Sequence, residues 1–344
     1  MRTHSKQPFP LLAITMGDPA GIGPEIVVKA FTLPNVRNVC RPVIIGSLPV
    51  FTRTIQDLNA NTNLRPVSQE FFFSAPHSFP KNSLFILDPI GKSLGRFSKG
   101  KPGKIPGKAS ESCIRAAVQL ALQGSVSGIV TAPINKESLH LAGCPFPGHT
   151  EFLGHLTKTK EFGMMLLGGP FKIVFVTTHV SIRSLPRLLT IERVQGAIVL
   201  AQRAMQKYFG VQNPRIGVAA LNPHGGEHGL FGDEEIRVIR PAISLARRKG
   251  MKLLGPLPAD TMFGKAVRGD FDVIVAMYHD QGLIPLKTVA FGECVNLTIG
   301  LPILRTSVDH GTAYDIAGQN MASPHSLIQA IHLAARLAGN IPPS

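Results

Sequence analysis

Short apolar runs alternate along this chain with segments in which apolar residues recur at helical spacing. Helical spacing is found at Ser110–Leu122, Thr190–Tyr208 and Asp233–Arg248. The apolar runs are Leu11–Thr15, Pro42–Gly46, Ser83–Leu87, Ser127–Ala132, Lys172–Thr178, Arg215–Leu221, Asp272–Met277 and Cys294–Gly300. These runs are continuously apolar rather than alternating, which is typical of strands covered on both faces. The pattern therefore predicts an α/β protein with mostly parallel sheets.

Three of the predicted strands are each followed by a histidine. His179, His224 and His279 come at or just past the carboxyl ends of apolar runs. In open parallel sheets that edge is where ligands bind. A single histidine there is more often a hydrogen-bonded structural residue, but three in the same topological position favour a divalent-metal site. Asp280, next to His279, is a candidate general base or a residue that orients the histidine.

Other polar residues near these strand ends suit an anionic ligand. His149 precedes Thr150, which we expect to cap a helix beginning at Glu151. Such a helix N-terminus suits a phosphate or carboxylate, although a plain capped helix explains the pattern about as well. Further along lie Lys287, Asn296 and Arg305. An arginine fork binds such groups bidentately and a lysine supplies a point charge, so the group indicates a small anionic substrate.

The glycines Gly21 and Gly23 follow the first predicted strand but do not form a dinucleotide-binding loop. The further glycine spacing fails, Pro24 stands at the helix start, and no acidic residue follows about twenty residues later. A nucleotide site, if present, has to lie elsewhere in the chain.

Composition and charge restrict the class of protein. The longest apolar runs are strand-length, far below the ~20 residues of a membrane span, and Leu11–Thr15 is too short for a signal peptide, so we expect a cytoplasmic protein. Four scattered cysteines indicate neither a disulfide framework nor a zinc ribbon. The net charge is +15, and the segment Gly91–Lys108 carries six basic residues and no acid. Nucleic-acid binding would explain this charge, but the chain has no tryptophan and no nucleic-acid motif. A mobile, Gly-rich surface loop or a basic environment that attracts anionic substrates is therefore the preferred interpretation.

Taken together, the motifs resemble the PdxA family of 4-hydroxythreonine-4-phosphate dehydrogenases of vitamin B6 biosynthesis. The most specific pieces are TAPINK, GHTEFL, LNPHGGEHG, GPLPADT, MYHDQGL and GLPILRTSVDHGTA, in that order. The similarity implies a divalent metal, such as zinc, magnesium or cobalt, held by His179, His224 and His279. It also implies substrate contacts from His149, Thr150, Lys287, Asn296 and Arg305. Family members are homodimers in which one metal ligand comes from the partner chain.

A second similarity concerns Asp309–Pro324, which resembles the loop that holds the adenosine of NAD in isopropylmalate dehydrogenases. The matching positions are His310, Gly311, Thr312, Ala313 and Asp315. Tyr314 and Ser323 depart from that pattern. The resemblance implies the isocitrate/isopropylmalate dehydrogenase-like fold of two α/β/α domains. We expect residues 1–130 and 288–344 to form a first, discontinuous domain with the NAD loop, and residues 131–287 to form the second, with the metal and the dimer contacts.

These resemblances imply an NAD- or NADP-dependent, metal-assisted oxidation, with decarboxylation, of 4-hydroxy-L-threonine 4-phosphate to 3-amino-2-oxopropyl phosphate. Asp280 and Lys287 are the candidate catalytic residues, and the partners are a small phosphorylated hydroxy acid and a second copy of the chain. Three alternatives remain open: a dehydrogenase of D-threonate or D-erythronate 4-phosphate, a metal-dependent phosphohydrolase, and a non-catalytic nucleic-acid-binding protein.

Overall fold

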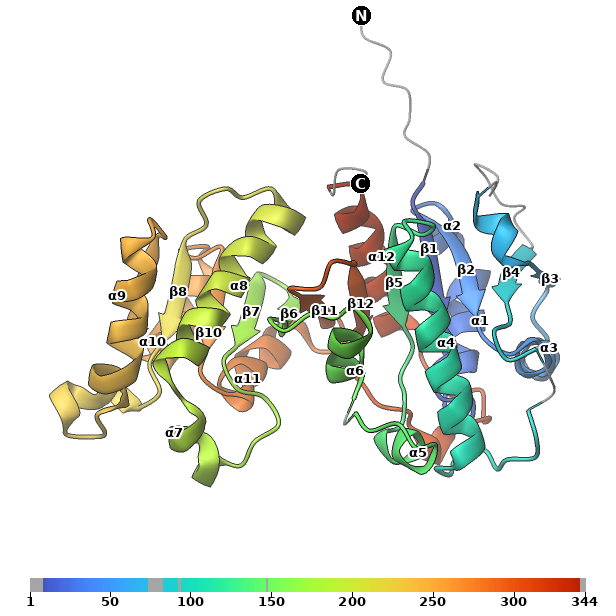
Figure 1. Cartoon of the computed structure of the whole chain (residues 1–344), viewed down its shortest axis with the longest axis horizontal. Coiled ribbons are helices and arrows are strands. Elements are labelled where there is room, and N and C mark those ends of the chain that lie inside the picture. Colours follow the sequence, from blue (N-terminus) through green and yellow to red (C-terminus); the bar gives the residue numbers. More distant parts are fainter. Residues whose placement is uncertain (1–8, 74–82, 92–93, 147, 341–344) are drawn as a thin grey trace, which may run out of the picture. The chain divides into compact units, whose positions relative to one another are not determined.

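The chain divides into two compact units. In this computed structural model, residues 9–73, 83–91, 94–146 and 148–340 are described. Unit 1 comprises Met1–Thr159 and Pro302–Ser344, and unit 2 comprises Lys160–Leu301. Both ends of the chain therefore belong to unit 1 (Figure 1).

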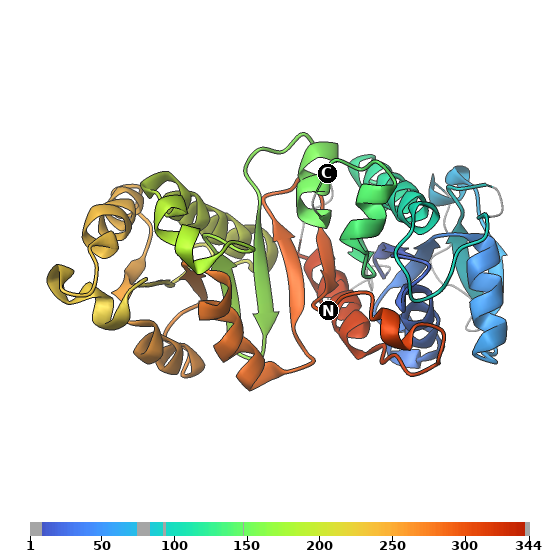
Figure 2. The same cartoon turned by 90° about the horizontal axis from the view of Figure 1, so that it is seen from below.

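Unit 1 is built on a parallel sheet with the strand order β3-β4-β2-β1-β5-β12. Its strands are β1 (Leu11–Thr15), β2 (Arg41–Ile45), β3 (Asn63–Pro66), β4 (Ser83–Leu87), β5 (Gly128–Thr131) and β12 (Arg305–Val308). Its helices are α1 (Gly23–Thr32), α2 (Pro34–Arg37), α3 (Leu48–Asp57), α4 (Lys104–Leu122), α5 (Lys136–Leu141), α6 (His149–Leu156) and α12 (His325–Ala338), with short 3-10 turns η1 (Gln69–Phe73) and η5 (Tyr314–Ile316). Helices α1 and α12 cover one face of the sheet and α4 covers the other (Figure 2). Strands β1 and β5 are buried along their whole length because both faces are covered.

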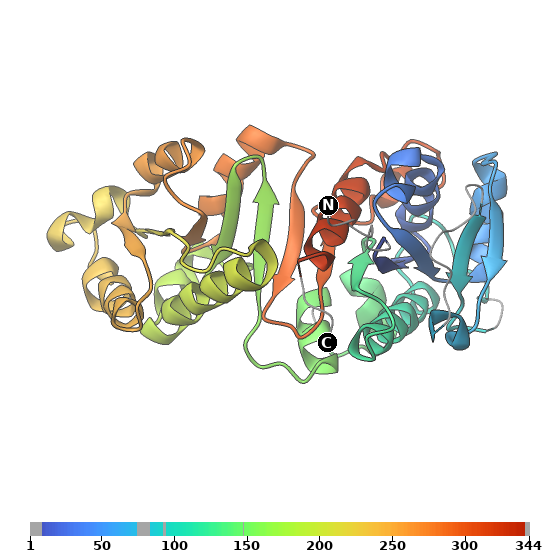
Figure 3. The same ribbon diagram turned by 90° about the horizontal axis from the view of Figure 1, so that it is seen from above.

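Unit 2 has a mixed sheet with the strand order β11-β6-β7-β10-β8-β9. Its strands are β6 (Gly163–Gly168), β7 (Phe171–Phe175), β8 (Ile216–Ala219), β9 (Leu253–Leu257), β10 (Val273–Ala276) and β11 (Val295–Ile299). Its helical segments are η2 (Ile182–Ser184), α7 (Leu185–Leu188), α8 (Ile191–Phe209), η3 (Pro223–Gly229), η4 (Glu235–Ile239), α9 (Arg240–Arg248), α10 (Ala259–Val267) and α11 (His279–Ala290). Strand β6 runs antiparallel to β7 and β11, and the other pairs are parallel. Helices α8 and α9 cover one face and α10 and α11 the other (Figure 3).

The predicted fold class, a mostly parallel α/β protein, is confirmed. Each predicted strand is present within three residues of its expected bounds, and the three predicted helices correspond to α4, α8 and the η4–α9 segment. Strands β3, β6, β9 and β12 were not predicted. The units meet in the sequence at 159/160 and 301/302, whereas the expected domain boundaries lay at 130/131 and 287/288. The difference arises because α5 and α6 pack with α4 in unit 1, and β11 pairs with β6 in unit 2.

Candidate functional site

The three strand-end histidines follow three neighbouring parallel strands of unit 2. Strand β10 pairs with β7 on one side and with β8 on the other, all in the same direction. His179 follows β7, His224 follows β8, and His279 follows β10. The topology therefore places all three at the carboxyl edge of one sheet, where ligands of such sheets bind.

Two of these histidines lie close together. The ring centroids of His179 and His279 are 5.7 Å apart, with the ring planes tilted by 43°. They line a pocket of about 320 Å³ together with Thr178, Ser181, Tyr278, Asp280 and the three apolar residues Val180, Ile182 and Leu185. Nδ1 of His279 is 2.7 Å from Oδ1 of Asp280. A carboxylate on one ring nitrogen favours the tautomer whose other nitrogen binds a metal, so this pair fits a divalent-metal site.

His224 occupies a different setting. It lies in η3, where His224, Glu227 and His228 all have positive φ angles of 42–56°. L-residues rarely adopt this conformation, so surrounding contacts have to hold it. Among the described residues, the structure brings no three potential metal-ligating side chains into one group. Within one chain, His179 and His279 are thus brought together and His224 is not placed with them.

A buried carboxylate holds the segment that carries His224. Glu235 is fully buried, and its Oε1 accepts hydrogen bonds from the backbone N–H groups of Leu221 and Asn222 at 2.7 and 2.8 Å. The amide of Asn222 donates to Oε2 of Glu235 at 2.9 Å and to Glu234 at 2.7 Å. These bonds stabilise the turn that leads into the left-handed residues.

Gln281 is a further site residue that sequence reasoning missed. Its Oε1 accepts a hydrogen bond from the backbone N–H of Met277 at 2.7 Å, and its Nε2 donates to the carbonyl of Ala220 at 2.6 Å. The side chain therefore ties the end of β10 to the end of β8, close to where two of the histidines emerge. The sequence does contain a signal for this role, because Gln281 is a polar residue followed directly by the buried residues Gly282 and Leu283.

Lys287 and Asn296 are also carried by unit 2. Lys287 is half-buried on α11, seven residues after Asp280, so both side chains project from the same side of that helix. Asn296 lies on β11 opposite Leu166, and its Oδ1 is buried without a hydrogen-bond partner among the described residues. A buried amide oxygen without a partner costs free energy, which is typical of a position that meets a ligand.

Unit 1 carries a second cluster made of Thr131, His149 and Arg305. Arg305 is 2% exposed, and its guanidinium donates to Thr131. Burial lowers the pKa of Arg305 to about 9, which leaves it cationic at neutral pH. Burial and, secondarily, the charge of Arg305 hold the pKa of His149 well below its usual range. Nε2 of His149 is buried and has no hydrogen-bond partner among the described residues. A buried cation beside a neutral imidazole can bind an anionic group that also carries a hydrogen-bonding atom.

The helix next to this cluster begins earlier than expected. Helix α6 starts at His149, not at Glu151, and its N-cap is Gly148 in an extended conformation. The prediction that Thr150 caps this helix is therefore wrong, and no side chain provides the cap. Thr150 lies instead in the first turn, directly after His149. Part of the motif that suggested the cap, Pro147, lies outside the described residues.

The loop after β12 contains the expected cofactor positions, His310, Gly311, Thr312, Ala313 and Asp315. Ala313 has a φ of 42°, and η5 follows it. The carbonyl of Thr312 accepts a hydrogen bond from Ile22 at 3.0 Å. A side chain on Gly21 would come within 2.8 Å of the same carbonyl, so only glycine fits there. The Gly loop after β1 therefore supports the loop after β12.

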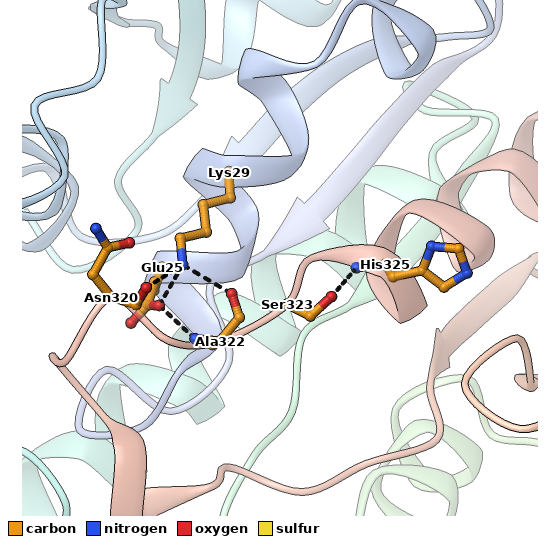
Figure 4. A network of polar contacts seen from close by, with 6 residues as sticks. All are labelled: Glu25, Lys29, Asn320, Ala322, Ser323 and His325. Carbon is orange, nitrogen blue, oxygen red and sulfur yellow. Dashed lines mark hydrogen bonds and ion pairs between the residues drawn. The ribbon is translucent and has the colours of Figure 1, made fainter.

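A charged network anchors the far end of the same loop. Nζ of Lys29 donates to Oε1 of Glu25 at 2.8 Å and to the carbonyls of Asn320 and Ala322 at 3.0 and 2.9 Å (Figure 4). Oε1 of Glu25 also accepts the backbone N–H of Ala322 at 2.9 Å (Figure 4). Two residues of α1 thus fix the chain just before α12.

The basic segment Gly91–Lys108 packs beside these loops. Residues 92 and 93 lie outside the described part, and Lys104–Lys108 form the start of α4. The N–H of Gly100 donates to the carbonyl of Ala20 at 2.8 Å. Nζ of Lys99 lies 3.7 Å from Oδ2 of Asp57, and the Lys99 side chain covers Gly318. Part of the positive charge is therefore adjacent to the expected cofactor loop.

No helix among the described residues is long and apolar enough to cross a membrane. Two α/β units that carry buried polar side chains near the ends of their strands are typical of α/β enzymes that bind small metabolites.

Within that class, the chain belongs to a known family. A family model described as "Pyridoxal phosphate biosynthetic protein PdxA" matches residues 38–334, most of the chain. This confirms the resemblance inferred from the sequence motifs.

Named relatives extend over nearly the full length. A protein of Desulfosudis oleivorans named 4-hydroxythreonine-4-phosphate dehydrogenase is 45% identical over 95% of this chain and 96% of its own. A protein of Salmonella typhimurium named D-threonate 4-phosphate dehydrogenase is 44% identical over 95% of this chain and 98% of its own. The solved structure of 4-hydroxythreonine-4-phosphate dehydrogenase from Klebsiella pneumoniae is 41% identical, with a TM-score of 0.87 and coverage of 96% and 99%.

Proposed function

We propose that this protein is a dehydrogenase that oxidises 4-hydroxy-L-threonine 4-phosphate with NAD or NADP as the acceptor. Loss of carbon dioxide from the resulting β-keto acid would give 3-amino-2-oxopropyl phosphate, a step in the biosynthesis of pyridoxal phosphate. The observation that carries the proposal is the full-length similarity to relatives of that name, at 45% identity over 328 residues. We place the enzyme in the cytoplasm and expect it to act as a homodimer.

The proposal assigns the metal to His179, His224 and His279. The 5.7 Å separation of the His179 and His279 rings and the hydrogen bond between Nδ1 of His279 and the carboxylate of Asp280 support two of these ligands. His224 completes the set, and a dimer that shares each metal between two chains would allow this. Asp280 then orients His279, so we favour this role for it over that of general base. When bound, a divalent ion such as zinc, magnesium or cobalt would polarise the substrate hydroxyl, and a nicotinamide would accept the hydride.

We assign substrate binding to His149, Thr150, Lys287, Asn296 and Arg305. The buried cation Arg305 binds an anionic group, and Nε2 of His149 and Oδ1 of Asn296 would receive the polar partners that they lack among the described residues. Lys287, on the same side of α11 as Asp280, binds an anion or donates a proton to the carbon left by decarboxylation.

The cofactor would bind the loop after β12 through His310, Gly311, Thr312, Ala313 and Asp315. Its support is the anchoring of this loop at both ends, by Ile22 and by the Lys29–Glu25 pair. Pre-ordered backbone reduces the entropy cost of binding. In this proposal unit 1 is the cofactor-binding domain and unit 2 carries the metal.

The second candidate function is the oxidation of D-threonate or D-erythronate 4-phosphate. The observation that favours it is the similarity to the Salmonella typhimurium protein, at 44% identity. A panel of these acids and 4-hydroxy-L-threonine 4-phosphate, each assayed with NAD and NADP by absorbance at 340 nm, tests both functions. The main proposal requires the highest kcat/KM for 4-hydroxy-L-threonine 4-phosphate, and a higher value for D-threonate 4-phosphate would replace it with the second.

The same panel separates a dehydrogenase from a metal-dependent phosphohydrolase. Release of inorganic phosphate without formation of NADH or NADPH would establish the hydrolase.

Removal of bound metal with a chelator should abolish activity, and added divalent ion should restore it. Full activity of protein shown to be metal-free by elemental analysis would contradict the metal assignment.

A further inference from the structure

The guanidinium of Arg305 is held along one edge by a single hydroxyl. Nε of Arg305 donates to Oγ1 of Thr131 at 3.1 Å, and Nη2 donates to the same oxygen at 2.6 Å. Both residues are buried, with exposed fractions of 2% for Arg305 and 1% for Thr131. Two hydrogen bonds to one edge of a planar group constrain its orientation as well as its position.

The strand register explains why Thr131 reaches this group. Arg305, the first residue of β12, lies opposite Ile129 of the parallel strand β5. Thr131 is two residues further along β5, so its side chain projects from the same face. Two strand residues span roughly 6.6 Å, which an extended arginine side chain can cover. The Arg305 side chain thus lies along the sheet, and its charge reaches the carboxyl end of β5.

We propose that Thr131 is a positioning residue for substrate binding, because its hydroxyl orients the guanidinium of Arg305 toward the anionic group of the substrate. This inference rests on the proposed function, in which Arg305 binds that group. The guanidinium has five N–H donors, and the two directed at Thr131 lie on the same edge. Because the guanidinium is planar and rigid, the orientation of that edge determines the direction in which the remaining N–H groups point. His149 lies near enough for the charge of Arg305 to lower its pKa, so the anion would meet both residues.

Three substitutions separate a positioning role from a structural one. Thr131→Val keeps the side-chain shape and removes the acceptor, and Thr131→Ser keeps the hydroxyl. Thr306→Val is the matched control, because the Thr306 hydroxyl is also fully buried in this sheet but donates to the carbonyl of Ala330 instead. Loss of either hydroxyl lowers stability, whereas only loss of the Thr131 hydroxyl removes the two hydrogen bonds that Nε and Nη2 of Arg305 donate to it.

Steady-state kinetics give the first readout. We expect Thr131→Val to raise the KM for the phosphorylated substrate about tenfold or more, with the KM for the cofactor and kcat changed less than about threefold. Thr131→Ser should restore most of the substrate affinity, and Thr306→Val should leave it as in the wild type. An unchanged substrate KM in Thr131→Val, or no rescue by serine, would overturn the inference.

Binding of inorganic phosphate gives a readout that does not need turnover. Phosphate should raise the Tm of the wild type, Thr131→Ser and Thr306→Val by similar amounts, and should raise that of Thr131→Val much less. If this pattern holds while the wild type oxidises none of the candidate acids, the proposed function fails and the positioning role stands. Equal stabilisation of Thr131→Val, or none in the wild type, would show that Thr131 does not support an anion site.

Discussion

The hydroxyl of Tyr314 donates a hydrogen bond to Oδ2 of Asp18 over 2.9 Å, joining two loops from opposite ends of the chain. Asp18 is fully buried, and its Oδ1 accepts the backbone N–H of Ala20 at 2.8 Å. Burial raises the pKa of Asp18, and hydrogen bonds from Ala20, Ser138 and Tyr314 offset part of that rise. Tyr314 is one of the two positions at which this loop departs from the pattern that it resembles, and its bond to Asp18 anchors the loop there.

Removal of this hydroxyl should weaken cofactor binding. Tyr314→Phe keeps the ring and leaves the buried Asp18 without one hydrogen bond, at a cost of about 1–3 kcal/mol. Because Ala313, one residue earlier, holds an unfavourable left-handed conformation, we expect the loop to become less ordered. The KM for NAD or NADP should rise several-fold, with a smaller change in the KM for the substrate, as measured by steady-state kinetics with each varied in turn.

The control for this substitution is Tyr208→Phe, which changes a buried tyrosine of α8 in unit 2. It should leave both KM values as in the wild type. Equal effects of the two substitutions on the cofactor KM would show that the loop does not depend on Tyr314.

Strand β12, which sequence reasoning missed, differs in one physical property from the strands that it found. Strands such as β1 and β10 are runs of aliphatic residues, which a rule based on apolar continuity detects. Strand β12 is equally buried but reads Arg305, Thr306, Ser307 and Val308. Its polar groups are accommodated by partners such as Thr131 and Ala330, which are remote in the sequence. A local pattern contains no information about such partners.

The candidate site was likewise only partly predictable, because a local sequence pattern does not show which remote residues become neighbours. The histidines could be predicted because each follows its strand within a few residues, so local order places them at one edge. The residues that hold these histidines could not be predicted. The bond that Gln281 donates to Ala220 and the bond that Glu235 accepts from Leu221 depend on which strands are neighbours. The helix start at His149 was missed for another reason: an extended glycine provides the N-cap there, without a capping side chain.

Asp280 should act on metal affinity through His279. Asp280→Asn replaces the carboxylate 2.7 Å from Nδ1 of His279 by a weaker hydrogen-bonding group. Loss of such a partner lowers metal affinity by roughly 10–100-fold. Competition titration of the metal-free protein with a chelator of known affinity measures this. Asp270→Asn, at an exposed acid of the same unit, should bind metal as the wild type does. An unchanged affinity in Asp280→Asn would leave general base as the remaining role for Asp280.

Replacement of Arg305 by another cationic residue should weaken substrate binding. Arg305→Lys keeps the charge but removes the fork that binds both Thr131 and an anionic group. We expect a loss of substrate binding of about 1.5–3 kcal/mol, seen as a raised substrate KM with an unchanged cofactor KM. Arg336→Lys on α12 is the matched control and should behave as the wild type. A wild-type substrate KM in Arg305→Lys would remove Arg305 from the anion site.

At pH values below the usual histidine pKa, His149 should make the free energy of unfolding depend on pH. The pKa of His149 in the folded state is well below its usual range, through burial and then the charge of Arg305. In the unfolded chain the same group takes up a proton near pH 6.5. Between these two pKa values the unfolded state binds more protons, so the free energy of unfolding falls as the pH is lowered. Above about pH 6.5 both states are neutral and His149 adds no pH dependence.

His149→Gln removes this titration. Urea unfolding at pH 7.5 and 5.5 should show that the wild type loses up to about 1.4 kcal/mol more than His149→Gln over this interval. His140→Gln, at an exposed histidine of α5 in the same unit, should follow the wild type at both pH values. Parallel losses in wild type and His149→Gln would mean that His149 can be protonated in the folded state. A positive imidazole next to Arg305 would then have to be added to the charges that meet the substrate.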